Sequence, residues 1–341
     1  MRVTLAMPHR DRTAGLTNVL LMSREESRDD VTLTNLDQPL FDDADATKRN
    51  LVDYLDGVRE RIIPVLADRP LSVIRVHRGQ EAFMQKNVPK YTPSWVHIVK
   101  LWAEASKREV SYALCNDRRT LLWFANQRAV EYHPTLVQVD RPDHPTHLVL
   151  DLDPPVGDGF SMAVRAAHVV RHALADLGLQ GAVKTSGAKG VHVFVPIADD
   201  VSSNDAAAAT RAIAARVERL DPAIATTAFM KQDRDGKVFI DATRVGGATV
   251  VAAYSPRVRP GVPVSFPVSW ADLNDVSPRD FSIHTALQQL GNGDPWTESM
   301  PAGQPLNPDL ITEGHAIPAG RVQAMHEGKR RARARRTDAA G

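Results

Sequence analysis

The stretch HLVLDLDPP, residues 147–155, alternates leucine with valine and then with aspartate. Side chains along a β-strand point to opposite faces in turn, so the three leucines are expected to face a core. Asp151 and Asp153 then share the other face, about 7 Å apart. Carboxylates at this separation suit hard cations such as Mg²⁺ or Mn²⁺, although a strand that ends at the surface leaves two solvated acids in the same pattern.

A glycine-rich turn follows in KTSGAKGVHVFVP, residues 184–196. Its glycines let backbone N–H groups approach a phosphate, and Lys189 adds a positive charge near the Ser186 hydroxyl. In the strand after the turn the valines face one way, which places His192 on the other face, where a polar site can use it. An ordinary hairpin turn and a buried core histidine are the alternatives that carry no function.

A third acid ends the stretch KVFID, residues 237–241. Val238 and Ile240 share one face of the expected strand, and Asp241 lies on the other. A lone aspartate at a strand end is usually a cap or a solvated charge. If the three strands are neighbours, however, Asp151, Asp153 and Asp241 together hold two cations about 4 Å apart. Such a pair activates an attacking oxygen and neutralises a leaving one in phosphoryl transfer.

Helical and strand-like patterns mix along the chain, which indicates an α/β or α+β protein. A helix is expected over residues 45–66, capped by Asp45 or Thr47 and ended by Pro64. Gly178 is expected to end a helix at residues 159–177. The other expected elements are a helix capped by Asn116, an alanine-rich helix capped by Ser203 or Asn204 and reaching residue 220, and strands at residues 31–35, 71–76, 182–185, 191–197, 237–241 and 249–253.

The composition is that of a globular chain: 341 residues, 43% hydrophobic and 24% charged. Its net charge of +1 does not by itself indicate a polyanionic partner. The one cysteine, Cys115, is expected to be a small buried apolar residue. No stretch approaches the roughly 18 apolar residues of a membrane span, and the N-terminus lacks the pattern of a signal peptide, so a cytoplasmic protein is expected.

Three regions are expected: a leader at residues 1–28, a catalytic domain of two interleaved subdomains at residues 29–290, and a Gly/Pro-rich tail at residues 291–341. The tail includes the basic run KRRARARR, residues 329–336. A solvated disordered tail and a phosphate-seeking arm are both compatible with such a run. The roughly 50 residues after residue 290 are too few for a further catalytic domain.

Together, in this order, these motifs resemble the archaeo-eukaryotic primase superfamily, in particular the polymerase domain of bacterial end-joining DNA ligases and most of all its stand-alone actinobacterial members, the primase-polymerases. The resemblance implies an α+β primase-polymerase fold, with a catalytic sheet related to the RNA-recognition fold and a smaller α/β subdomain packed beside it. The stretches that carry it are LDLDP (150–154), TSGAKGVH (185–192), VFID (238–241), AAYSPR (252–257), RPLS (69–72) and VEYH (130–133).

The resemblance also implies roles for individual residues. Asp151, Asp153 and Asp241 match the family's ligands for two Mn²⁺ or Mg²⁺ ions. The implied nucleotide-binding residues are Ser186, Lys189 and His192 at the triphosphate, together with His133 and Arg257. The implied DNA-binding residues are Asn35 and Lys48 at a 5′-phosphate, with Phe83 and Lys86 in the segment that handles the template.

The chain departs from the family pattern at three places. Gln38 stands where the family usually has a lysine, which removes one cation from the expected 5′-phosphate site. Met84 replaces the second of two aromatics next to Phe83, and methionine packs more softly on a base. The third departure is ATR, residues 242–244, directly after Asp241, which leaves the expected ligand in place.

We therefore expect a template-dependent nucleotidyltransferase that fills short gaps or extends broken DNA ends and prefers ribonucleotides. The primer 3′-hydroxyl attacks the α-phosphate and pyrophosphate leaves. The expected partners are gapped or broken duplex DNA, nucleoside triphosphates, a separate DNA ligase and an end-binding protein.

Two alternatives stay open. The Asp-Leu-Asp pattern after a hydrophobic strand also begins aspartyl-phosphate phosphatases and occurs in glycosyltransferases, although Pro155 stands where a phosphatase usually has threonine or valine. The other alternative is a non-catalytic DNA-end platform that recruits a ligase.

Overall fold

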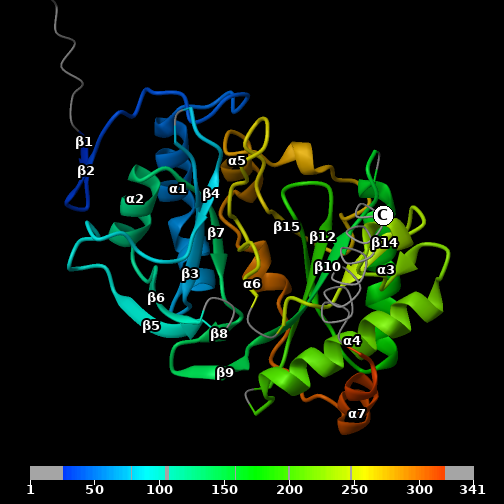
Figure 1. Ribbon diagram of the computed structural model, residues 1–341. Helices are drawn as coiled ribbons and strands as arrows, with labels where there is room; N and C mark the ends of the chain where they lie inside the picture. The colour runs from blue at the N-terminus through cyan, green and yellow to red at the C-terminus, as the bar shows by residue number, and fades with distance from the viewer. Residues whose placement is uncertain are drawn as a thin grey trace, which may run out of the picture.

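Two β-sheets, one of five strands and one of six, organise the chain, and helices pack against both (Figure 1). The computed structural model describes residues 26–77, 79–103, 107–157, 159–198, 200–245 and 248–318. In Figure 1 the five-stranded sheet, blue to cyan-green, lies beside the six-stranded sheet, which is green to yellow. Within the described residues every strand pair except β13–β14 is antiparallel. The expected α+β class is therefore confirmed.

The first part of the chain builds the five-stranded sheet. Strand β3 pairs with β4, β6 and β7, and α1 packs against α2 through a stripe of fully buried side chains at helical spacing. The elements are β1 (Glu26–Arg28), β2 (Val31–Leu33), α1 (Lys48–Leu66), β3 (Leu71–Arg75), β4 (Phe83–Gln85), β5 (Ile98–Ala103), β6 (Arg108–Ala113), α2 (Arg118–Asn126), β7 (Ala129–Pro134), β8 (Val137–Gln138) and β9 (Arg141–Pro145).

The middle of the chain builds the six-stranded sheet, in the order β13-β14-β10-β12-β11-β15. Helices α3 and α4 pack on its central strands. The three leucines of β10 are fully buried, as expected, and so is Val149 on the other face, which shows that both faces are covered at the centre. The elements are β10 (His147–Asp153), α3 (Phe160–Asp176), β11 (Ala182–Thr185), β12 (Val191–Pro196), α4 (Ser203–Leu220), β13 (Ala225–Thr226), β14 (Val238–Asp241) and β15 (Pro267–Val268).

Helix ends differ from expectation at three places. Pro64 does not end α1, which continues to Leu66, because a proline near a C-terminus removes only one hydrogen bond while the last turn stays anchored by buried leucine. Asp117, and not Asn116, caps α2. Ser202, one residue before the expected caps, caps α4. Two other expectations are confirmed: Thr47 caps α1, and Gly178 follows α3 with a φ of 69°.

The expected strand at residues 249–253 does not form, apart from one bridge between Thr249 and Thr135. Instead, the backbone N–H groups of Val250 and Ala252 donate to Pro134 O and Tyr132 O. The segment therefore returns from the six-stranded sheet and lies along β7 of the five-stranded one. This return interleaves the two halves in sequence.

The expected tail begins later than residue 291. Helices α5 (Ala286–Leu290), α6 (Pro295–Ser299) and α7 (Pro308–Ala316) belong to the folded body. Trp296 of α6 packs edge-on against Phe194 of β12, with ring centroids 5.1 Å apart, and α7 lies against α4 at the lower edge of Figure 1. The basic run at residues 329–336 and residues 1–25 of the expected leader lie outside the described residues, whereas residues 26–28 form β1.

Cys115 is fully buried, and burial raises the pKa of its thiol, in agreement with the expected apolar role. Among the helices in the described part of the chain, none combines the length and the apolar character that crossing a bilayer requires.

The docking of α7 on α4 can be tested at Gly314. A Cβ atom on Gly314 would lie 1.9 Å from the Ala208 carbonyl oxygen of α4. In an undocked helix Gly314→Ala would be favourable by about 1 kcal/mol, whereas in the docked helix we expect it to lower stability by roughly 1–3 kcal/mol. Thermal unfolding followed by circular dichroism measures the change. Gly293→Ala is the matched control, since its nearest neighbour is the flexible Glu298 carboxylate at 3.3 Å; a raised melting temperature for Gly314→Ala would contradict the docking.

Candidate active site

Four polar side chains lie in a row across the six-stranded sheet. Asp151 of β10 is directly opposite Asp241 of β14 on one side and His192 of β12 on the other, and His192 is opposite Lys184 of β11. Residues directly opposite one another share a face of the sheet. Asp153, two residues after Asp151, lies on the same face. The register of β10 with β14 therefore brings the three predicted acids together.

Arg244 joins the two facing aspartates. Its Nε and Nη2 atoms donate to Asp151 Oδ2 at 3.0 and 2.7 Å, and Nη2 lies 3.2 Å from Asp241 Oδ2. The other two oxygens are also engaged, since Asp151 Oδ1 lies 3.2 Å from His192 Nε2 and Asp241 Oδ1 accepts hydrogen bonds from N and Oγ1 of Thr243. Like charges directly opposite each other destabilise a sheet, so Arg244 supplies the compensating cation.

The two acids of β10 have opposite pKa shifts. Burial by itself would raise the pKa of Asp151, but the charges and hydrogen bonds of His192 and Arg244 outweigh burial and hold that pKa below its ordinary value. Burial and the neighbouring charge of Asp151 raise the pKa of Asp153 above its ordinary value. Asp153 is therefore the carboxylate that an added cation would stabilise most.

His192 lies between Asp151 and a buried lysine. Its Nδ1 atom is 2.9 Å from Lys184 Nζ, which also donates to Ser265 Oγ. Burial and the charge of Lys184 lower the pKa of His192 to about 4, and burial lowers the pKa of Lys184 well below its ordinary value. Both ring nitrogens of His192 thus have protein partners, and its contact with Asp151 Oδ1 holds that carboxylate in position. Its expected contact with a triphosphate stays a prediction.

The glycine-rich turn lies beside these acids. The Ser186 hydroxyl accepts hydrogen bonds from the N–H groups of Ala188 and Gly190, so it shapes the turn. Gly187 has a φ of 67°, and a Cβ there would lie 2.6 Å from Arg257 Cγ, so only glycine fits. Lys189 is exposed and donates to Pro154 O at 2.7 Å, which ties the turn to the end of β10.

A cavity of about 1000 Å³ opens in front of the acids, at the large end of small-ligand sites. Basic side chains outnumber acidic ones around it, which favours a polyanionic ligand. Of the predicted site residues, Asp151, Asp153, Ser186, Lys189, His192 and Arg257 line it, together with Asp45, Arg244, Arg259, Arg279 and His284. Asp241 is buried beneath Arg244 and does not line the cavity.

His133 does not line this cavity. It is buried in β7, and its Nε2 atom lies 2.8 Å from Glu131 Oε2. Glu131 also pairs with Arg257, with Nε and Oε2 3.1 Å apart, and these partners outweigh burial to lower the pKa of Glu131 to about 2. His133 thus reaches the cavity only through Glu131, which orients Arg257. Its part in nucleotide binding stays a prediction.

Of the two residues expected at a 5′-phosphate, Lys48 is the first residue of α1 and Asn35 lies in the loop after β2. Asn35 is exposed with a φ of 54°, next to the exposed Gln38. Lys48, by contrast, is only 3% exposed, and its ammonium donates to Thr34 O and Asn126 Oδ1. Burial lowers its pKa to about 8. The structure therefore does not present Lys48 as a surface cation, and its role in phosphate binding stays a prediction.

The residues expected to handle the template lie on or next to β4. Phe83 is 39% exposed and stacks on His77 at 5.3 Å, and Met84 is 45% exposed. Lys86 is exposed directly after the strand. Tyr91 and Trp102, in the same part of the chain as the five-stranded sheet, are also exposed. Aromatic side chains other than the predicted residues can therefore stack on bases.

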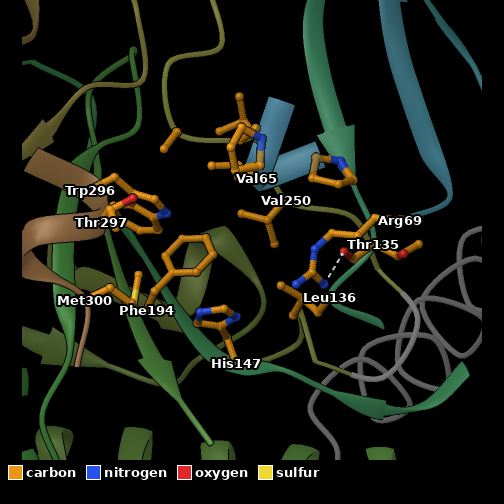
Figure 2. A pocket seen from close by; sticks show the side chains of 15 residues that line it. Val65, Arg69, Thr135, Leu136, His147, Phe194, Val250, Trp296, Thr297 and Met300 are labelled. Atoms are coloured by element: carbon orange, nitrogen blue, oxygen red, sulfur yellow. Dashed lines mark hydrogen bonds between the residues drawn. The ribbon is translucent and has the colours of Figure 1, made fainter. Parts of the chain in front are cut away.

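A second cavity, of about 370 Å³, lies between the two sheets near the start of β10 (Figure 2). Phe194 and Trp296 form one wall, and Arg69 extends toward the opposite side, where it donates to Thr135 O and Thr146 Oγ1. None of the predicted site residues lines it. Arg69 therefore braces the two halves, and the expected chemistry belongs to the larger cavity.

Sequence reasoning missed the roles of Arg244, Lys184 and Glu131. Lys184 and Glu131 stand inside stretches quoted above, and strand alternation places Lys184 on the face of His192. The role of Arg244 could have been predicted from its position three residues after Asp241. Two acids that face each other on neighbouring strands require a cation between them, and Arg244 is close enough in sequence to supply it.

Whether divalent cations fit this site depends on which side-chain atoms can bind them. Carboxylate oxygens are the ligands that Mg²⁺ and Mn²⁺ prefer, and the facing pair already binds one cationic group. As the side chains stand, however, the described residues contain no group of three acidic, histidine or cysteine side chains placed to hold a metal. The donors therefore suit the ions, but Arg244 has to move before Asp151 and Asp241 can bind one.

Residues 47–296 match the sequence model of the family described as the LigD primase-polymerase domain. The multifunctional non-homologous end joining protein LigD of Mycobacterium bovis is 33% identical over 288 residues, which cover 81% of this chain and 38% of that protein. The bifunctional LigD of Bacillus subtilis is 30% identical over 262 residues, 75% of this chain and 42% of that protein. The chain thus spans about two fifths of the length of these relatives.

Among solved structures, the polymerase domain of Mycobacterium tuberculosis Ligase D, in complex with DNA, superposes with a TM-score of 0.72. The two chains are 33% identical, and the match covers 80% of this chain and 99% of that domain. The range matched by the family model, residues 47–296, contains the three acids and the glycine-rich turn. The chain belongs to the LigD primase-polymerase domain family.

Proposed function

We propose that the chain is a DNA-directed nucleotidyltransferase that extends DNA ends or fills short gaps during end joining. The observation that carries the proposal is the cluster of carboxylates on β14 and β10, of which Asp151 and Asp153 line a large basic cavity. A basic cavity next to clustered hard donors suits phosphoryl transfer from a nucleoside triphosphate. The family's relatives, named as end-joining proteins, support the same activity.

Asp151, Asp153 and Asp241 would hold two Mg²⁺ or Mn²⁺ ions, which when bound supply positive charge at the reacting phosphate. Lys189 and Arg257 are placed to bind the phosphates, Lys189 as a point charge and Arg257 through its fork of N–H donors. Glu131 orients Arg257, and His192 orients Asp151. The primer 3′-hydroxyl would attack the α-phosphate, so that one P–O bond forms and the bond to pyrophosphate breaks.

The exposed Phe83 and Met84 would contact template bases, and the turn at Asn35 and Gln38 would approach a 5′-phosphate across the gap. The preference for ribonucleotides, the separate ligase and end-binding protein as partners, and the cytoplasmic location stay predictions. Comparing ribonucleotide with deoxyribonucleotide incorporation on one gapped substrate tests the first of these.

The carboxylate row makes the first prediction for this function. We expect Asp151→Asn to reduce primer extension on a gapped duplex by roughly a hundredfold or more, because the amide removes a negative ligand at the reacting phosphate. Gel-resolved extension of a labelled primer with Mn²⁺ or Mg²⁺ measures this. Asp143→Asn, on the exposed part of β9, is the matched control. Near-normal extension by Asp151→Asn rules out the proposed site, and tight gap binding without extension by the unaltered chain favours the non-catalytic platform.

Gln38 makes the second prediction. Gln38→Lys adds an exposed cation beside Asn35, so we expect tighter binding of gapped DNA that carries a 5′-phosphate, with a salt dependence steeper by about one unit of slope. Fluorescence anisotropy with phosphorylated and unphosphorylated gaps at several salt concentrations measures both quantities. Gln289→Lys, an exposed substitution of equal charge on α5, controls for general attraction to DNA. An equal gain for both gaps would show that the turn does not contact the 5′-phosphate.

A further inference from the structure

Among the described residues of the cavity wall, Arg244 is the one basic side chain that contacts two of the predicted metal ligands. Nη2 lies 2.7 Å from Asp151 Oδ2 and 3.2 Å from Asp241 Oδ2, so one nitrogen bridges carboxylates from neighbouring strands. A bridging cation between two carboxylates occupies the kind of position that a divalent ion takes in a two-metal site.

The backbone after β14 holds Arg244 in this position. The N–H and hydroxyl of Thr243 both donate to Asp241 Oδ1, at 2.8 and 2.6 Å, which turns the chain back over the strand end. The guanidinium is then aimed across the sheet at Asp151.

The charges around Arg244 favour this arrangement strongly. Asp151 and Asp241 are both buried and face each other in register, so two negative charges without a cation would repel at short range. Asp153 adds a third negative charge nearby. The side chain of Arg244 is itself one-third exposed, at 33%, and opens onto the cavity, so it can leave the acids without unfolding the sheet.

We propose that Arg244 is an internal counter-ion that holds the acid pair in the metal-free state and competes with a divalent cation for it. The inference rests on the proposed function. Because the guanidinium must leave before a cation can bridge Asp151 and Asp241, cation binding to the protein alone is weakened. A bound triphosphate supplies both further ligands for the cation and an acceptor for the released guanidinium. Arg244 thereby couples cation binding to nucleotide binding.

The test is Mn²⁺ binding to the full chain without DNA or nucleotide, measured by isothermal titration and by the electron paramagnetic resonance signal of free Mn²⁺. We expect Arg244→Gln to bind Mn²⁺ at least about tenfold more tightly than the unaltered chain, equivalent to about 1.4 kcal/mol. Arg279→Gln removes an equal charge from the cavity wall without a recorded contact to the acids, and we expect it to change the affinity far less. Arg244→Lys, which keeps the charge but loses the fork, should fall between.

Two further readouts distinguish competition from a purely structural role. In metal-free buffer the melting temperature of Arg244→Gln should fall, and Mn²⁺ should raise it by more than in the unaltered chain. A non-hydrolysable nucleoside triphosphate should increase Mn²⁺ affinity by a larger factor in the unaltered chain than in Arg244→Gln. Should Arg244→Gln fail to fold by circular dichroism, the same comparisons with Arg244→Lys decide the question.

The outcomes separate this inference from the proposed function. One outcome overturns the role of Arg244 and leaves the metal site standing. In it the unaltered chain binds Mn²⁺, Asp151→Asn abolishes that binding, and Arg244→Gln binds Mn²⁺ no more tightly than the unaltered chain. If the unaltered chain, Arg244→Gln and Asp151→Asn all fail to bind Mn²⁺ with and without nucleotide, both the inference and the proposed metal-assisted function are wrong.

Discussion

The register of β10 between β14 and β12 is the constraint on which the site depends. It places Asp151 directly opposite Asp241 and His192. A shift of either neighbour by one residue would move its polar side chain to the opposite face, since side chains alternate along a strand. The buried leucines of β10 and the valines of β12 fix this register, because a slip would move them out of the apolar core to the face that carries the polar row. The apolar face of the sheet thus positions the polar one.

The charges gathered by this register are not balanced by the acids and histidine alone. Burial and Lys184 lower the pKa of His192, so the permanent positive charge in contact with both Asp151 and Asp241 is that of Arg244. Asp153 receives less compensation, and its pKa is raised. A site in which one guanidinium serves two carboxylates and a third acid is under-compensated is poised to accept an additional cation.

The cavity in front of the acids draws on segments far apart in the chain. Lys189 comes from the turn between β11 and β12, Arg257 from the segment after the return to β7, and Arg279 from a short 3₁₀ helix near the C-terminal helices. Glu131 of the five-stranded sheet holds Arg257 in place. The two sheets therefore cooperate in one site.

The sequence alone determined the strands that carry the acids, the side of each strand on which they lie, the glycine-rich turn and the α+β class, because alternation and glycine chemistry are local properties. Other features depended on contacts between distant residues. Tertiary structure decided that Arg244 bridges two acids, that His192 binds Asp151 and Lys184, and that Lys48 and His133 are buried. It also decided that residues 291–318 pack on the body and that residues 249–253 return to β7. The physical reason is that partner, burial and charge state are set by the side chains that folding brings close, and the spacing of residues along the chain does not specify them.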